Sequence, residues 1–176
     1  MTNPGYMDSV LDGNDLYTQN CQRCIWAYEL LRRGYSVEAK SWNPGDDQKG
    51  FGKSSPNYAN SFANVSTVPL DFSHVIGTPW RPALANDINR YILQNFPEGS
   101  RGALVMWRRS PAGHVVNWEI SNGKVQIYDG QPGEKSSISS LKAHGGVMFA
   151  ADRMDDKEIN LNLINDYVER TKVLHL

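Results

Sequence analysis

The sequence contains few cysteines and no long apolar segment. Its 176 residues include two cysteines, Cys21 and Cys24. Two cysteines at this spacing do not make a disulfide framework and would stay reduced in a cytosol. No run of about 18 apolar residues occurs, so the sequence predicts no membrane-spanning helix. Residues 1–13 are polar and do not resemble a signal peptide. If the protein leaves a cell, we therefore expect another route or a larger parent chain to carry it.

An excess of positive charge is also missing. The chain has 18 Lys and Arg residues and 19 Asp and Glu residues, which give a formal net charge of -1. Proteins that bind nucleic acid or anionic membranes usually carry a basic excess, so we expect neither as a partner. The basic pairs Arg32–Arg33 and Arg108–Arg109 are interpreted as solvated or helix-end charges rather than as a binding patch.

The length suits one domain, and the chain contains no internal repeats. We expect a polar N-terminal arm over residues 1–20 and a single domain over residues 21–176. Helical spacing of apolar residues predicts helices over residues 21–33, 83–96 and 158–170. Short β-branched and aromatic segments predict strands over residues 36–39, 65–70, 103–107, 115–120, 124–129 and 147–151. Residues 43–64 are predicted to form a long loop that either borders a substrate cleft or covers the surface.

The first predicted helix has clear signals at both ends. Asn20 suits the N-cap, and Gly34 suits the position just after the last turn. Cys21 then lies in the first turn, where the helix dipole and free N–H groups lower the pKa of a thiol and favour the thiolate. Cys24 lies on the apolar side of the helix and is interpreted as a small core residue. Cys21 is therefore the candidate nucleophile.

The dipeptide Asn122-Gly123 predicts a two-residue hairpin turn of type I′. In that register Ser121 faces Lys124, and side chains alternate between the two faces of the ribbon. One face is then apolar and should pack on the core; it carries Val116, Trp118, Ile120, Val125 and Ile127.

The same register brings His114 and Asp129 together at the end of the hairpin away from the turn, with Gln131 beside them. They are diagonal neighbours, and a diagonal separation of about 7–8 Å between backbones is within reach of a hydrogen bond between long side chains. A purely structural His–Asp hydrogen bond is the alternative interpretation. The other histidines, His74, His144 and His175, lack comparable partners nearby in the sequence.

A metal site and a redox pair are two other uses of Cys-x-x-Cys. Zinc needs two further ligands at close spacing, and the histidines are single and scattered, so we expect no metal and no cofactor. A thioredoxin-type pair needs a preceding strand, whereas the residues before Cys21 are polar. A His–carboxylate pair elsewhere in the chain strengthens the case that a lone cysteine is a nucleophile. The order Cys, His, Asp is that of the papain-like fold, an α+β fold in which a helix N-terminus abuts an antiparallel sheet.

Two stretches resemble the motifs of papain-fold toxin domains, the glutamine deamidases of polymorphic bacterial toxins and secreted effectors. They are NCQRCIWAYELLRRGYSVEA, which begins at Asn20, and GHVVNWEISNGKVQIYDGQPG, which begins at Gly113. The segment from Leu93 to Asn95 followed by Gly102 to Met106 is similar to the element before the histidine in those effectors. No resemblance is found over residues 40–80, which we expect to set the substrate.

The resemblance implies a catalytic triad of Cys21, His114 and Asp129 and hydrolysis of a protein glutamine side chain to glutamate and ammonia. It implies that Gln131 supports the histidine or the substrate. Gln19 is a candidate oxyanion donor by analogy with the glutamine upstream of the cysteine in papain-like proteases, although its spacing differs. A cysteine peptidase or transglutaminase of the same fold, and a non-catalytic binding module, remain as alternatives.

The resemblance also carries expectations about biology. It implies a bacterial toxin or effector domain that is secreted or delivered into a target cell and acts in the cytosol there. The expected partners are a protein substrate and a cognate immunity protein.

Overall fold

The computed structural model describes residues 2–13, 17, 20–41, 82–108, 114–138, 146–159, 165 and 168–171. The predicted strand over residues 65–70 and the predicted loop over residues 43–64 lie outside this set. The expected α+β class is confirmed, because helices pack on antiparallel strands.

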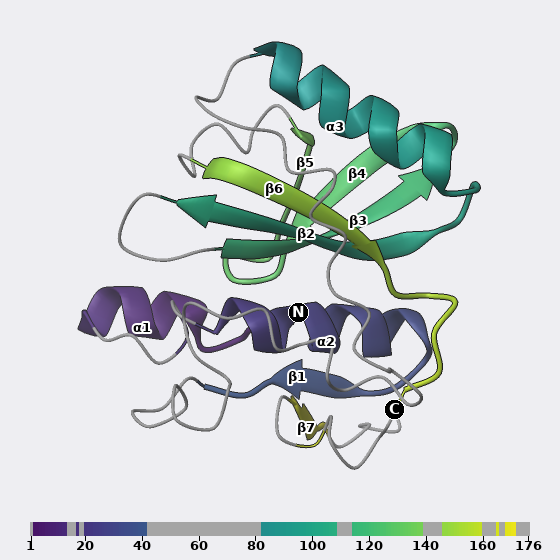
Figure 1. Ribbon diagram of the computed structural model, residues 1–176. Helices are drawn as coiled ribbons and strands as arrows, with labels where there is room; N and C mark the ends of the chain where they lie inside the picture. The colour runs from purple at the N-terminus through teal and green to yellow at the C-terminus, as the bar shows by residue number, and fades with distance from the viewer. Residues whose placement is uncertain are drawn as a thin grey trace.

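A five-stranded antiparallel sheet forms the middle of the molecule (Figure 1). The strands lie in the order β5-β4-β3-β2-β6. Their bounds are β2 (Arg101–Arg108), β3 (His114–Ser121), β4 (Lys124–Asp129), β5 (Glu134–Ser136) and β6 (Gly146–Arg153). Four of the five match predicted strands. The fifth, β5, has the polar sequence Glu-Lys-Ser and forms because its backbone pairs with the edge of β4.

The hairpin of β3 and β4 has the predicted turn and register. Asn122 and Gly123 have φ angles of 53° and 69°, the left-handed conformation that a type I′ turn requires at both positions. Ser121 pairs with Lys124, and the ladder continues to the pair Asn117–Tyr128. The positions of His114 and Asp129 thus follow from a turn that tolerates little beyond Asn and Gly.

Helices cover the two faces of this sheet (Figure 1). On one face lies α3 (Pro82–Asn95), where Ile88 and Ile92 pack on the apolar side of the hairpin that the register predicted. On the other face lies α2 (Cys21–Arg32), whose buried residues contact Ala103, Val105 and Val115. The central strand β3 is therefore buried on both faces along most of its length, whereas β5 is largely exposed.

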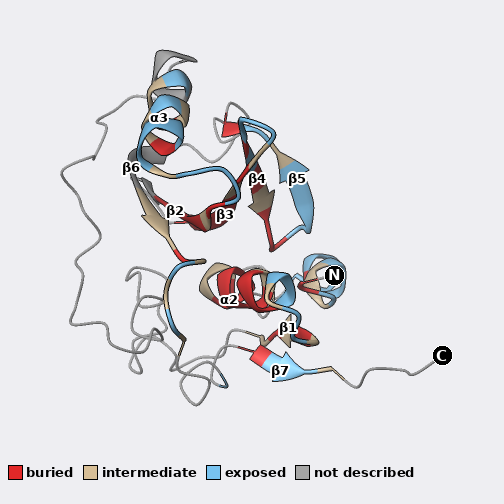
Figure 2. Cartoon of the chain, turned by 90° about the vertical axis from the view of Figure 1, so that its right-hand side faces the viewer, coloured by how far each residue is buried: buried red, intermediate tan, exposed pale blue. Residues whose placement is uncertain are grey.

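Most residues of helix α2 are buried, as Figure 2 shows. The helix ends at Arg32, and Gly34 takes the C′ position as predicted, with a φ of 91°. The N–H of Gly34 donates to the carbonyl of Leu31 at 3.0 Å, and that of Tyr35 donates to Leu30 at 3.0 Å, the pattern of a Schellman motif. Asn20 occupies the N-cap position, but its side chain makes no capping hydrogen bond.

A two-stranded ribbon packs on the side of α2 that faces away from the sheet. It consists of β1 (Val37–Ala39) and β7 (Val168–Arg170), which pair antiparallel. The predicted helix over residues 158–170 is wrong at β7. Pairing with β1 and burial of Val168 beside Val37 and Ala39 favour the extended backbone there, and helical spacing in the sequence cannot reveal that partner.

The N-terminal residues form ordered structure where a loop was predicted. Helix α1 (Tyr6–Asp12) follows Thr2 and Asn3, and both of these polar residues are buried. The backbone carbonyl of Thr2 accepts a hydrogen bond from the N–H of Ala39 at 2.8 Å. None of the helices within the described ranges is long and apolar enough to cross a membrane.

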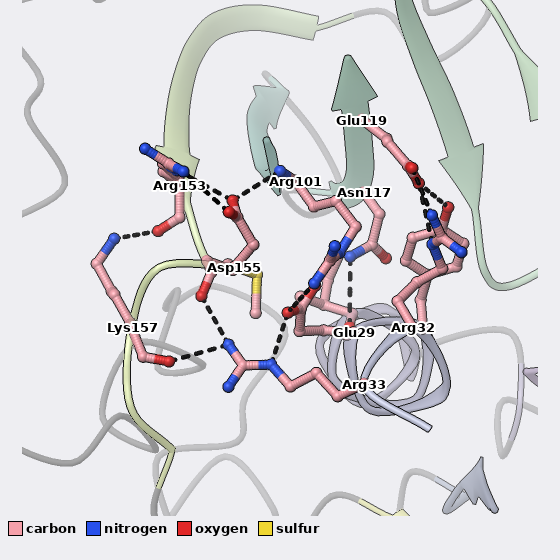
Figure 3. A network of polar contacts seen from close by, with 12 residues as sticks. Glu29, Arg32, Arg33, Arg101, Asn117, Glu119, Arg153, Asp155 and Lys157 are labelled. Atoms are coloured by element: carbon pink, nitrogen blue, oxygen red, sulfur yellow. Dashed lines mark hydrogen bonds and ion pairs between the residues drawn. The ribbon is translucent and has the colours of Figure 1, made fainter. Parts of the chain in front are cut away.

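A network of charged residues fixes the C-terminal half of α2 against the sheet (Figure 3). The fully buried Glu29 accepts hydrogen bonds from Arg101 at 3.0 Å and from Arg33 at 2.7 Å. Arg32 pairs with Glu119 at 2.6 Å. The pair Arg32–Arg33 is thus engaged in ion pairs at a helix end, in line with the helix-end interpretation, and a buried charge such as Glu29 needs such partners.

Candidate active site

Cys21 is the first residue of α2. Its thiol is free and partly exposed, and its side chain packs at the margin of the core between α2 and the sheet. The residue before it, Asn20, supplies the carbonyl that accepts the first helical hydrogen bonds, from Arg23 at 2.9 Å and Cys24 at 3.1 Å. The thiol is therefore at the positive end of the helix dipole and within reach of solvent.

His114 and Asp129 form the hydrogen bond that the hairpin register predicted. His114 is the first residue of β3, Asp129 is the last of β4, and Nε2 of the histidine lies 2.8 Å from Oδ2 of the carboxylate. Both residues are buried, at 5% and 7% exposure. Burial of both groups is tolerated because each satisfies the other.

The imidazole of His114 also makes a hydrogen bond with Cys21, so the three predicted side chains meet. Burial lowers the pKa of His114, but the hydrogen bond to Asp129 and the interactions with Cys21 outweigh it and raise that pKa from 6.5 to about 9. Because Nε2 is engaged by Asp129, Nδ1 is the ring nitrogen available to the thiol. A histidine that stays protonated beside a thiol favours the thiolate form.

The turn after β4 holds the carboxylate in place. The backbone N–H of Gln131 donates to Oδ1 of Asp129 at 3.1 Å, which leaves Oδ2 for the histidine. Gly130 lies against α2, and a Cβ atom at this position would come within 2.6 Å of the Cβ of Cys24. A glycine is required here because the turn that carries the acid is in direct contact with the helix that carries the thiol.

Cys24 differs from Cys21 in its surroundings. Its side chain is 1% exposed, and Sγ lies 3.5 Å from Oδ1 of Asn20. Burial, followed by the charges of Cys21 and Asp129, raises the pKa of the Cys24 thiol well above its usual value. Cys24 is therefore a core residue that stays protonated, as the sequence indicated.

Of the other candidate site residues and histidines singled out in the sequence, the structure describes Gln131 alone. Gln131 is buried beside the His–Asp pair, and its backbone positions Asp129. Gln19, His74, His144 and His175 lie outside the described residues. Within the part of the chain that the structure describes, no three His, Cys, Asp or Glu side chains are grouped so as to hold a metal ion.

Sequence reasoning missed two residues beside the site, Thr2 and Asn3. The hydroxyl of Thr2 donates to the carbonyl of Gly130 at 3.1 Å, and the amide of Asn3 donates to the carbonyl of Gln131 at 3.1 Å. Both contacts join positions separated by 128 residues. No local pattern could have indicated them, because their partners lie so far away in the sequence.

The family model described as papain fold toxin 1, glutamine deamidase, matches residues 19–134. The match covers more than half of the chain and includes Cys21, His114 and Asp129. No curated protein matches the chain. The family match confirms the resemblance drawn from the two motifs and the papain-like fold. The chain belongs to the family of papain fold toxin 1 glutamine deamidases.

Proposed function

We propose that the protein hydrolyses the side-chain amide of a glutamine on a target protein, with Cys21 as the nucleophile. The observation that carries this proposal is the 2.8 Å hydrogen bond between His114 and Asp129. The imidazole of His114 also makes a hydrogen bond with the thiol of Cys21, which lies at the start of a helix. Membership of the glutamine deamidase family supports the choice of reaction and of a protein substrate.

In the first half of the reaction, the Cys21 sulfur attacks the carbonyl carbon of the glutamine carboxamide. The bond from carbon to oxygen becomes single, and the backbone N–H of Cys21, in the first turn of α2, is placed to stabilise the negative oxygen. His114 then gives its proton to the nitrogen, the carbon–nitrogen bond breaks, and ammonia leaves. The product is a thioester between Cys21 and the target.

In the second half, water replaces the thiol. His114, now neutral, takes a proton from water as the oxygen attacks the thioester carbon. The carbon–sulfur bond breaks, glutamate is released, and the proton on His114 restores the starting ion pair. Asp129 keeps Nε2 engaged throughout, so Nδ1 always faces the reacting atoms.

Two glutamines have supporting roles in this proposal. Gln131, buried beside the pair, supports the substrate or the histidine. Gln19 lies outside the described residues, and its role as an oxyanion donor stays a prediction from the sequence. The description of the family as a toxin supports a role as a toxin or effector domain. A bacterial origin, action inside a target cell and a matching immunity protein are further parts of the proposal.

Intact-mass spectrometry of a treated target protein tests the reaction type. Deamidation should leave the chain whole and add the mass difference between a hydroxyl and an amino group for each converted glutamine. Shorter fragments would identify a peptidase and overturn the proposal. With methylamine added as a probe, a mass gain equal to methylamine minus the ammonia released would identify a transglutaminase.

Cys24→Ser should keep most of the deamidase activity. The side chain is small, buried and held protonated, so it has no part in the chemistry, and serine preserves its contact with Asn20. Burying a hydroxyl in place of a thiol is expected to lower the free energy of unfolding by about 1 kcal/mol. Steady-state kinetics and a thermal melt measure the two effects. An inactive but folded variant would mean that Cys24 rather than Cys21 is the nucleophile.

The pKa of His114 is expected to fall in Asp129→Asn. The wild-type pKa is raised to about 9, and the hydrogen bond to Asp129 is the strongest of the causes that raise it. Removing the carboxylate removes that stabilisation of the imidazolium, so its proton should be lost at a lower pH. Proton NMR titration measures this, with the His114 resonance assigned by its absence in His114→Ala. An unchanged titration would contradict the pairing of His114 with Asp129.

A further inference from the structure

The side chain of Asn3 makes polar contacts with three other segments of the chain. Asn3 is 2% exposed, and its Nδ2 lies within hydrogen-bond distance of three acceptors: the backbone carbonyls of Tyr17 at 3.0 Å and Gln131 at 3.1 Å, and Oδ1 of Asn20 at 3.3 Å. The two amide hydrogens are shared among these acceptors. Oδ1 of Asn3 accepts a hydrogen bond from Nδ2 of Asn20 at 2.9 Å. The side chain thus has every polar atom engaged within the protein.

The first partner, Asn20, fixes the start of the nucleophile helix. Its backbone carbonyl accepts the first hydrogen bonds of α2, and it directly precedes Cys21. Its side chain does not cap the helix but is shared between Asn3, the carbonyl of Lys40 at 2.9 Å, and the thiol of Cys24. A shift of Asn20 would therefore move the backbone N–H and the sulfur of Cys21.

The second partner, Gln131, fixes the acid of the His–Asp pair. Its N–H donates to Oδ1 of Asp129, while its carbonyl accepts from Asn3. The neighbouring carbonyl of Gly130 accepts from the hydroxyl of Thr2 at 3.1 Å. Residues 2 and 3 thus hold both carbonyls of the turn that orients the carboxylate.

We propose that Asn3 is a positioning residue that joins the start of α2 to the turn after β4 and so sets the placement of Cys21 relative to His114 and Asp129. The proposal rests on the proposed roles of those three residues. Asn3 lies outside residues 19–134, the segment that the family model matches, so the family match does not cover this contact. Asn3 touches no substrate and acts through Asn20 and Gln131.

The test measures alkylation of Cys21 by iodoacetamide, which depends on the thiolate beside His114 and not on any glutamine substrate. Asn3→Ala should slow labelling at about pH 6 by about tenfold, because a displaced thiol is a poorer partner for the imidazolium. Deamidation should show a kcat that is 10- to 100-fold lower, with KM changed by no more than about twofold. Peptide mass spectrometry assigns the label to Cys21 rather than to the buried Cys24.

Ser9→Ala is the matched control. Ser9 is as buried as Asn3, and its hydroxyl accepts a hydrogen bond from the N–H of Tyr17 at 3.1 Å, so the variant loosens the same N-terminal segment. The contact of the Ser9 hydroxyl with Tyr17 involves neither Asn20 nor Gln131, so wild-type labelling and kcat are expected. Asn3→Ser is made in parallel in case the alanine variant does not fold, since serine keeps the buried site polar but is too short to span both partners.

A lowered melting temperature with wild-type labelling and kcat in the folded Asn3 variant would overturn the proposal and leave Asn3 with a structural role alone. Slow labelling in the Asn3 variant and not in Ser9→Ala would support it. If that labelling difference is seen while the wild type releases no ammonia from any protein, the positioning role is supported and the glutamine reaction alone is overturned.

Discussion

Cys21→Ala is expected to lower kcat for glutamine deamidation on the order of 10⁶-fold, because no other described group can form the thioester. Cys24 is buried and protonated and cannot substitute for it. The fold should remain, since Cys21 is only partly buried at the margin of the core and alanine suits the first turn of a helix. Ammonia release from a target protein measures the loss, and a thermal melt confirms folding.

The same variant separates an enzyme from a binding module. Expressed in a sensitive cell, the wild type should stop growth, while Cys21→Ala at equal abundance should not. Equal toxicity of the two would mean that the protein acts by binding and that its thiol is dispensable.

Asp129→Asn is expected to lower kcat about 10⁴-fold. The oxygen of the introduced amide can still accept the hydrogen bond from the Gln131 N–H, so the turn should persist, but an amide cannot stabilise the imidazolium of His114 as a carboxylate does. When an amide N–H faces Nε2, the neutral ring is held in the wrong tautomer, with its proton on the nitrogen that should receive one.

Asp87→Asn provides the control for the change in net charge. Asp87 lies on α3, on the opposite face of the sheet from α2, where it pairs with Arg90 on the surface. Its activity should stay within about twofold of the wild type, as is usual for surface substitutions. Near wild-type activity in a folded Asp129→Asn variant would show that Asp129 is not the third member of the site.

The features that the sequence predicts well are those set by local chemistry. Asn122-Gly123 requires a type I′ turn, the turn sets the register, and the register places His114 beside Asp129. The end of α2 follows in the same way from Gly34. Its start lies at the predicted position after Asn20, although the side chain of Asn20 makes no capping hydrogen bond. Two of the three proposed catalytic residues were thus brought together without knowledge of the fold.

Features that depend on distant partners were not predicted. Strand β7 is extended because β1 pairs with it, and its own residues 168–170 do not reveal that partner. Thr2 and Asn3 are ordered because carbonyls of Gly130 and Gln131 accept their hydrogen bonds. The meeting of Cys21 with the His–Asp pair also needed the packing of α2 on the sheet, which the sequence motifs indicated only through the family resemblance.

The most direct test of the proposed reaction is a search for glutamine-to-glutamate changes in a cell lysate incubated with the protein. Wild type and Cys21→Ala are compared at equal concentration, and peptides are quantified by mass spectrometry. The account predicts one or a few glutamine sites that are converted to glutamate by the wild type and not by the variant, with the target chains intact. Cleaved chains, or the same modified peptides with both proteins, would contradict it.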